Sequence, residues 1–201
     1  MQVNTYAGFY TFDSTNLKNI KTILFKKIQM KKLILFIAFI LSISAFGQTK
    51  DDRAYLVKVG DKAPDFSIKM TTGKIVKLSD LKGKVVMLQF TASWCSVCRK
   101  EMPFIERDIW QKHKNNKNFT LMAIDRDEPR ETVVKFARSI PATYPFGLDS
   151  KANIFALFAA REAGITRNVI IDKTGKIVFL TRLYDVKEFN KMTKVIDELL
   201  K

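Results

Sequence analysis

The chain holds only two cysteines, Cys95 and Cys98, and their setting constrains the fold more than any other feature. They follow a short, nearly continuous apolar run at residues 85–90, which predicts a strand buried on both faces. After them, apolar residues recur at helical spacing from residue 96 to about 113. The order strand, cysteine pair, helix therefore lies at the centre of whatever domain this chain forms.

Two intervening residues make a ring too small to stabilise a fold much, so the pair indicates chemistry rather than structural support. A cysteine that caps the helix beginning at Ser96 places its sulfur against unpaired amides at the positive end of the helix dipole. The pKa of Cys95 should then fall below about 8.5, which predicts that Cys95 is the nucleophile. Cys98 lies one turn later on the same face and is predicted to resolve the mixed disulfide.

Glu101 lies three residues beyond Cys98 and is predicted to accept and return its proton. The alternative is an ordinary solvated glutamate. A zinc site is the competing interpretation of the cysteine pair, but tetrahedral zinc needs four ligands and the chain adds only His113, which we expect at the surface of a helix end. We therefore expect no metal.

The net charge of +15 raises the question of nucleic acid as a partner. The basic residues are scattered and do not alternate with aromatic residues that stack on bases. We therefore expect no nucleic-acid partner and interpret the charge as solvated surface.

Residues 30–47 have the layout of a secretory signal peptide, with lysines before an apolar run that ends in small residues, and cleavage is expected before Gln48. About 14 apolar residues fall short of the roughly 20 that span a bilayer, so an uncleaved anchor is the minor alternative. Residues 1–29 are interpreted as an upstream extension or a misassigned start, 48–58 as a tether, and 59–201 as one folded domain. The expected location is the periplasm.

The remaining pattern predicts an α/β domain. Each expected element follows from its apolar periodicity and the turn residues that bound it. They are a hairpin at 66–70 and 75–78, a strand at 119–124, helices at 131–139 and 152–160, a second hairpin at 168–172 and 177–180, and a final helix at 186–200.

Residues 90–103 resemble the active-site segment of TlpA/ResA-like thioredoxins: Trp94 precedes the first cysteine, Glu101 follows the second, and Pro103 lies beyond. A looser resemblance covers about residues 59–201. It implies a thioredoxin-like fold, with a central mixed β-sheet flanked by α-helices and an N-terminal β-hairpin. It also implies that Cys95 is exposed, that Cys98 is sheltered and that Glu101 tunes the cysteine pair. Trp94 is expected to shape the surface beside the disulfide.

The chain departs from that family at Thr166, where such proteins place a cis-proline opposite the cysteines. A cis bond before a residue other than proline costs about 2.5–4 kcal/mol. The sequence alone therefore does not decide whether the peptide bond before Thr166 is cis or trans. Thr166, Arg167 and Trp94 are predicted to contribute to substrate docking. The absence of that proline, with an arginine nearby, also resembles peroxiredoxins, so a thiol peroxidase is an alternative.

The resemblance implies a thiol-disulfide oxidoreductase acting on disulfides of exported proteins. On resemblance alone we expect a reductase, with apocytochrome c among its clients and a membrane electron donor of the DsbD type. Neither a cofactor nor a stable oligomer is expected. The alternative from another functional class is a thioredoxin-fold binding module whose cysteine pair is inert.

Overall fold

A computed structural model describes Lys27 and residues 53–201. Residues 53–201 belong to one compact unit. The predicted signal peptide, nearly all of the upstream extension and the start of the tether lie outside the described residues. Among the helices of the described part, none is long and apolar enough to span a membrane.

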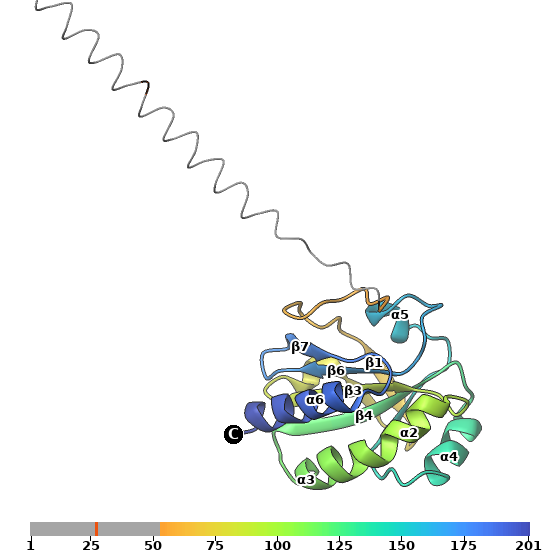
Figure 1. Ribbon diagram of the computed structural model, residues 1–201. Helices are drawn as coiled ribbons and strands as arrows, with labels where there is room; N and C mark the ends of the chain where they lie inside the picture. The colour runs from red at the N-terminus through yellow and green to blue at the C-terminus, as the bar shows by residue number, and fades with distance from the viewer. Residues whose placement is uncertain (1–26, 28–52) are drawn as a thin grey trace, which may run out of the picture. The chain divides into compact units, whose positions relative to one another are not determined.

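The domain is built on one seven-stranded sheet with the order β2-β1-β5-β4-β3-β6-β7 (Figure 1). Strands β3, β4 and β5 run parallel to one another, and the outer strands are antiparallel to their neighbours. The mixed sheet expected from the resemblance is therefore confirmed. The strands are β1 (Ser67–Met70), β2 (Ile75–Lys77), β3 (Val85–Thr91), β4 (Phe119–Arg126), β5 (Phe146–Asp149), β6 (Arg167–Ile171) and β7 (Ile177–Leu180).

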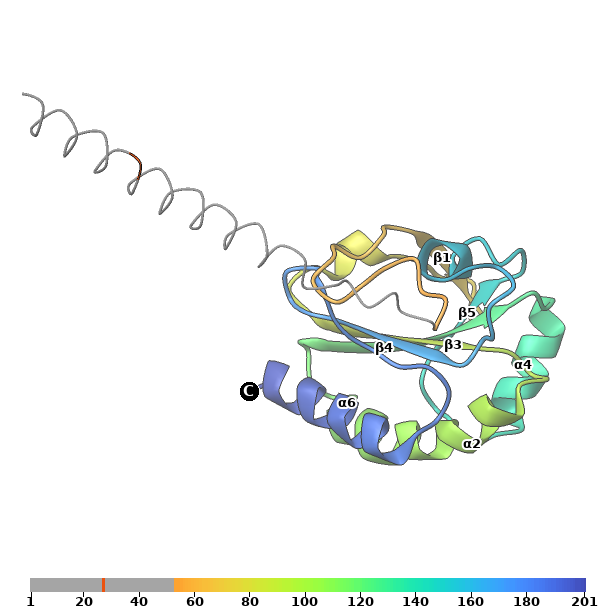
Figure 2. The same ribbon diagram turned by 45° about the horizontal axis from the view of Figure 1, so that its top comes forward.

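Helices cover both faces of this sheet, as Figure 2 shows. One face packs on α2 (Ser96–Ile105), α4 (Arg130–Arg138) and α6 (Val186–Leu199). The other face packs on α5 (Phe155–Phe158) and on the 3-10 turn η1 (Leu78–Leu81). Since β3 lies between these two cores, all seven of its residues are buried, as the apolar run predicts.

The helix after the cysteines is one continuous path in three parts. After α2 the chain widens into a π-helical turn, η2 (Glu106–Trp110), and ends in α3 (Gln111–His113). Pro103 lies inside α2 and cannot donate a backbone hydrogen bond. The sequence predicted a single helix over this range; its extent is confirmed, whereas the π-helical turn was not foreseen.

The folded unit begins earlier than the predicted boundary at residue 59. Tyr55 donates its hydroxyl to the carbonyl of Thr181 at 2.5 Å, and the backbone amide of Leu56 donates to the carbonyl of Phe158 at 2.8 Å. Arg53 contacts Glu188 of α6 at 3.0 Å. The second half of the predicted tether is therefore part of the domain.

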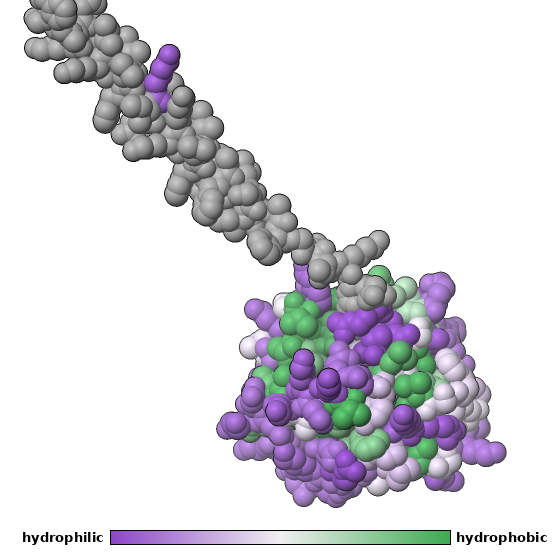
Figure 3. All heavy atoms as spheres, viewed as in Figure 1, coloured by the Kyte–Doolittle hydropathy of each residue, from purple (hydrophilic) through white to green (hydrophobic). Residues whose placement is uncertain are grey.

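The surface is mostly hydrophilic on the face seen in Figure 1. In the space-filling view of that face, hydrophobic residues form small, separate patches among hydrophilic ones (Figure 3).

Candidate active site

Cys95 is the N-cap of α2, as predicted from the sequence. Its backbone is extended, with φ −82° and ψ 102°, and the amide of Cys98 donates to its sulfur at 3.1 Å. The two cysteines form a disulfide, with Cα atoms 5.3 Å apart. Cys95 is only 6% exposed, so the expectation of an exposed Cys95 is corrected: the residue is mostly enclosed and borders a pocket, whereas Cys98 is fully buried.

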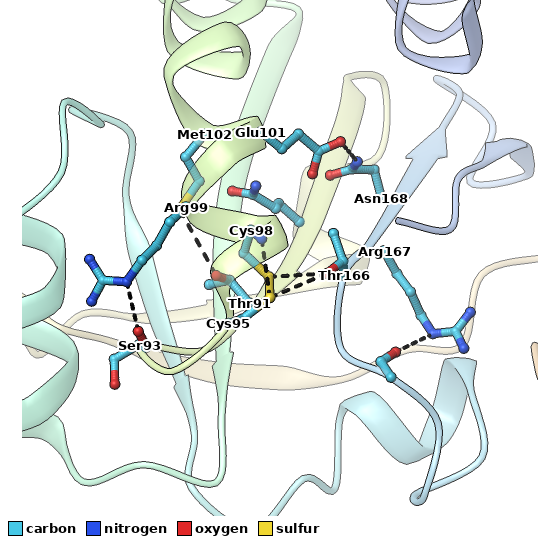
Figure 4. The surroundings of a disulfide bond; sticks show 12 residues. Thr91, Ser93, Cys95, Cys98, Arg99, Glu101, Met102, Thr166, Arg167 and Asn168 are labelled. Atoms are coloured by element: carbon cyan, nitrogen blue, oxygen red, sulfur yellow. Dashed lines mark hydrogen bonds between the residues drawn. A yellow bond between two sulfur atoms is a disulfide. The ribbon is translucent and has the colours of Figure 1, made fainter. Parts of the chain in front are cut away.

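Thr166 meets both sulfurs from the loop that leads into β6 (Figure 4). Its Oγ1 lies 3.2 Å from Sγ of Cys95 and 3.4 Å from Sγ of Cys98. None of the peptide bonds between residues 53 and 201 is cis, so the bond before Thr166 is trans. The site thus has a hydroxyl, held by a trans backbone, in the place where the related proteins have a proline ring.

Glu101 lies buried one turn beyond Cys98, at 1% exposure. Asn168 of β6 donates its side-chain amide to Oε1 of Glu101 at 2.8 Å (Figure 4) and also donates to Oγ1 of Thr181 at 2.9 Å. Burial raises the pKa of Glu101 to about 7, and the hydrogen bond from Asn168 opposes this rise. Glu101 is therefore a buried carboxyl group whose pKa lies near neutral pH, rather than a solvated surface group.

Two further buried polar residues, Gln89 and Tyr144, lie near Glu101. The hydroxyl of Tyr144 donates to Oε1 of Gln89 at 2.8 Å. Burial raises the pKa of Tyr144, and the charge of Glu101 adds to that effect. Sequence reasoning missed Gln89 and Asn168, although each is a polar residue within a mostly apolar strand, and that pattern was the available signal.

Asp125 and Glu128, two carboxyl groups that sequence reasoning also missed, lie near the loop that precedes the cysteines. Glu128 accepts hydrogen bonds at 2.5 Å from both the amide and the hydroxyl of Ser93, and Nε of Arg99 donates to the carbonyl of Ser93 at 2.9 Å. Asp125 is fully buried at the end of β4, and burial together with the charge of Glu128 raises its pKa to about 8. These contacts fix the chain just before Trp94.

A pocket of about 330 Å³ opens beside the disulfide. Its lining comes from the start of α2, the Thr166 loop and the segment after β7. The lining residues are Trp94, Cys95, Ser96, Val97, Gly164, Ile165, Thr166, Arg182 and Leu183.

Two of the three residues predicted to dock substrate lie at this pocket. Trp94 is 61% exposed at its edge, and Thr166 lies in its wall. Arg167 is 1% exposed and turns away from the cysteines. It donates to the carbonyl of Gly164 at 3.1 Å and stacks on the ring of Tyr55 at 4.4 Å. The predicted docking role of Arg167 is corrected: it supports the Thr166 loop from inside.

His113 also differs from its expected place at the surface. Nε2 of His113 lies 2.8 Å from Oδ1 of Asp197 on α6, and the ring packs on Phe119. It joins α3 to α6 at the end of the domain opposite the cysteines. Within residues 53–201, no group of three His, Cys, Asp or Glu side chains is placed to hold a metal ion.

Comparison with known proteins gives one consistent family. Residues 58–196 match the redoxin family. The thiol-disulfide oxidoreductase ResA of Bacillus cereus is 33% identical over 122 residues, which cover 61% of this chain and 68% of the relative. The ResA of Bacillus subtilis is 32% identical over 122 residues, covering 61% and 66%.

Solved structures agree with this assignment. The solution structure of a proposed protein disulfide isomerase from Bacteroides thetaiotaomicron is 63% identical, with a TM-score of 0.72, over 73% of this chain and 92% of that chain. A proposed DsbE thiol:disulfide interchange protein from Chlorobium tepidum is 32% identical, with a TM-score of 0.64, over 72% and 99%. With the bonded cysteine pair at the head of α2, these likenesses show that the chain belongs to the redoxin family as a TlpA/ResA-like thiol-disulfide oxidoreductase of thioredoxin fold.

Proposed function

We propose that this protein reduces disulfide bonds of exported proteins. The observation that carries the proposal is the unequal burial of the two sulfurs, with Cys95 reaching the pocket and Cys98 fully enclosed behind it. A client sulfur can then meet Cys95 alone. The resemblance to TlpA/ResA-like proteins favours reduction as the direction of electron flow.

The reaction is two exchanges. The Cys95 thiolate attacks one sulfur of the client disulfide, a mixed disulfide forms, and the other client sulfur leaves as a thiolate. The Cys98 thiolate then attacks Cys95, the Cys95–Cys98 bond forms, and the second client thiolate leaves. Two electrons pass to the client, and the pair ends oxidised.

Glu101 is proposed to handle the proton of this second step. Cys98 must lose its proton to attack, and a carboxylate whose pKa is about 7 is half ionised at neutral pH. Asn168 holds that carboxylate by a hydrogen bond to one oxygen. Thr166 is proposed to serve Cys95 in a parallel way, by donating its hydroxyl to the thiolate.

The cellular setting is part of the proposal. The predicted signal peptide at 30–47 would export residues 48–201 to the periplasm as a monomer, and a DsbD-type membrane donor would regenerate the reduced pair. Apocytochrome c is proposed among the clients. We favour exchange with protein disulfides over a thiol peroxidase, since the resolving cysteine lies one helical turn from the nucleophile.

The direction of electron flow is tested by the reduction potential of the pair, measured against a dithiothreitol series. A value near −270 mV, at the thioredoxin end of the range, is expected for a reductase. A value near −120 mV would indicate an oxidant and contradict the proposed direction.

The client class is tested by trapping. Cys98→Ser should accumulate mixed disulfides between Cys95 and exported proteins, because the resolving thiol is absent. Cys95→Ser is the matched control and should trap nothing. If Cys98→Ser captured no exported protein, the proposed client class would be wrong.

A further inference from the structure

Arg182 follows β7 and lines the active-site pocket together with Cys95 and Thr166. Its guanidinium lies directly on the backbone of Gly164. A Cβ atom at position 164 would come within 2.5 Å of Nη2 of Arg182. The absence of a side chain at Gly164 is therefore what lets this charged group lie in the wall of the pocket.

The guanidinium has no acceptor within the described part of the chain. Nη1 is covered and makes no hydrogen bond, and no carboxylate oxygen of the described residues lies within 4.0 Å of the group. Glu188 does bond Arg182, but through the backbone amide of Arg182, which donates to Oε2 of Glu188 at 3.3 Å. Oε1 of Glu188 accepts from Arg53 at 3.0 Å.

This arrangement is unusual because partly buried charges in proteins are generally paired. Arg126 and Arg161 show the ordinary case, since their guanidinium groups donate to backbone carbonyls. Because Nη1 is covered, Nε and Nη2 of Arg182 are the donors left for a group outside the domain. A planar fork of donors fits a carboxylate best.

Apart from Ser96 and Thr166, the rest of the pocket lining carries no polar side chain. Trp94 is 61% exposed and Leu183 is 47% exposed, and Val97 and Ile165 line the space between them. One unpaired cation in an apolar rim recognises a segment that carries one acid beside apolar residues.

We propose that Arg182 selects clients that carry an aspartate or glutamate close to the disulfide under attack. The inference rests on the proposed function, because it assigns a preference within the same exchange reaction. The carboxylate of the client pairs with the Arg182 guanidinium while Cys95 attacks the client sulfur. Arg182 forms no covalent bond, and the electrons move as in the exchange described above.

The test uses two synthetic peptides with an internal disulfide that differ only by glutamate or glutamine next to one cysteine. The reduced protein is mixed with each, and the second-order rate constant of oxidation is followed by tryptophan fluorescence at low salt. The readout is the ratio of the two rate constants within each variant. That ratio is independent of any general loss of activity.

The wild-type protein should oxidise about fivefold to tenfold faster with the glutamate peptide. Arg182→Gln should bring the ratio close to one, and Arg182→Lys should keep part of the preference, because the charge remains and the fork is lost. Arg138→Gln, on the exposed end of α4, removes the same unit of charge elsewhere and should keep the wild-type ratio.

A wild-type ratio near one, or an unchanged ratio in Arg182→Gln, would overturn the inference. An equal fall in Arg138→Gln would also overturn it, since the preference would then come from the net charge. Failure of both peptides to react would instead refute the proposed function, so the two failures are distinguishable.

Discussion

At the scale of single residues, the site depends on side chains that touch the cysteine pair from two directions. Thr166 contacts both sulfurs from the β6 loop, and Glu101 lies below Cys98 on α2. The proposed roles assign them to different sulfurs: the Thr166 hydroxyl would stabilise a Cys95 thiolate, whereas the Glu101 carboxylate would take the proton of Cys98. Substitutions should therefore separate the two exchange steps.

Removing the Thr166 hydroxyl should raise the pKa of Cys95. A hydrogen bond to the charged form of a group lowers its pKa, so Thr166→Val should raise the Cys95 pKa by about one unit. Thiolate absorbance of the reduced protein against pH measures this change. Thr166→Ser keeps the hydroxyl and should titrate like the wild type. An unchanged pKa in Thr166→Val would show that the contact does not act on the thiolate.

Glu101→Gln should slow the second exchange and remove its pH dependence near neutrality. The wild-type rate should rise through about pH 7, where the carboxyl loses its proton. Loss of the base should slow the step about 100-fold at pH 7.5. Rapid-mixing measurements of mixed-disulfide decay give this rate. Glu131→Gln, exposed in the first turn of α4, is the control, and an inflection near pH 7 that persists in Glu101→Gln would contradict the assignment.

The sequence identified Cys95, Cys98 and Glu101 because their spacing on one helix suffices to bring them together. It could not place Arg167, because the residue lies in a strand whose twist and neighbours decide which way the side chain points. Gln89 and Asn168 were missed for a related reason. Their contacts with Tyr144 and Glu101 join residues that are far apart in the chain.

At the scale of elements, the cysteine pair lies at the junction of β3 and α2, and the sequence predicted both elements. The apolar run and the helical period are local signals, and they are strong here. Strand β5 was missed, because four residues that begin with Phe146 and Gly147 show no alternation. It forms because β4 and β1 offer backbone partners on either side.

Gly147 is required in β5 by the close approach of β1. A Cβ atom there would lie 2.4 Å from Cδ1 of Ile68. Gly147→Ala should therefore lower the free energy of unfolding by about 1–3 kcal/mol in urea titrations.

The contact itself is tested by a double variant. Ile68→Ala removes both Cδ1 and Cγ1, which would lie 2.4 Å and 2.8 Å from the added Cβ, so Gly147→Ala should cost less in that background than in the wild type. Equal costs in the two backgrounds would show that Ile68 is not the obstacle.

At the scale of the whole molecule, buried acids should set the pH dependence of stability. The pKa of Glu101 is raised from 4.5 to about 7 and that of Asp125 from 3.8 to about 8, so the folded state binds more protons than the unfolded state between about pH 4 and pH 8. Stability must then fall as the pH rises through this window. Asp65, Asp172 and Asp197 have lowered pKa values, so their contribution is lost in acid, below about pH 4.

The oxidised protein should therefore be most stable between about pH 4 and pH 5, as measured by thermal unfolding from pH 3 to pH 9. Glu101→Gln removes one of the two buried acids and should gain at most about 3 kcal/mol over the wild type at pH 8, with no gain at pH 4. A wild-type stability that rises steadily from pH 5 to pH 8 would contradict this account.

The cysteine ring encloses only Ser96 and Val97, and that small size has a consequence for repeated turnover. By the chain-entropy relation, so short a loop contributes only about 2 kcal/mol to stability. The rest of the stability comes from two apolar cores, of which only one includes the two cysteines. The cysteine pair can thus be oxidised and reduced many times, because the fold does not require either oxidation state.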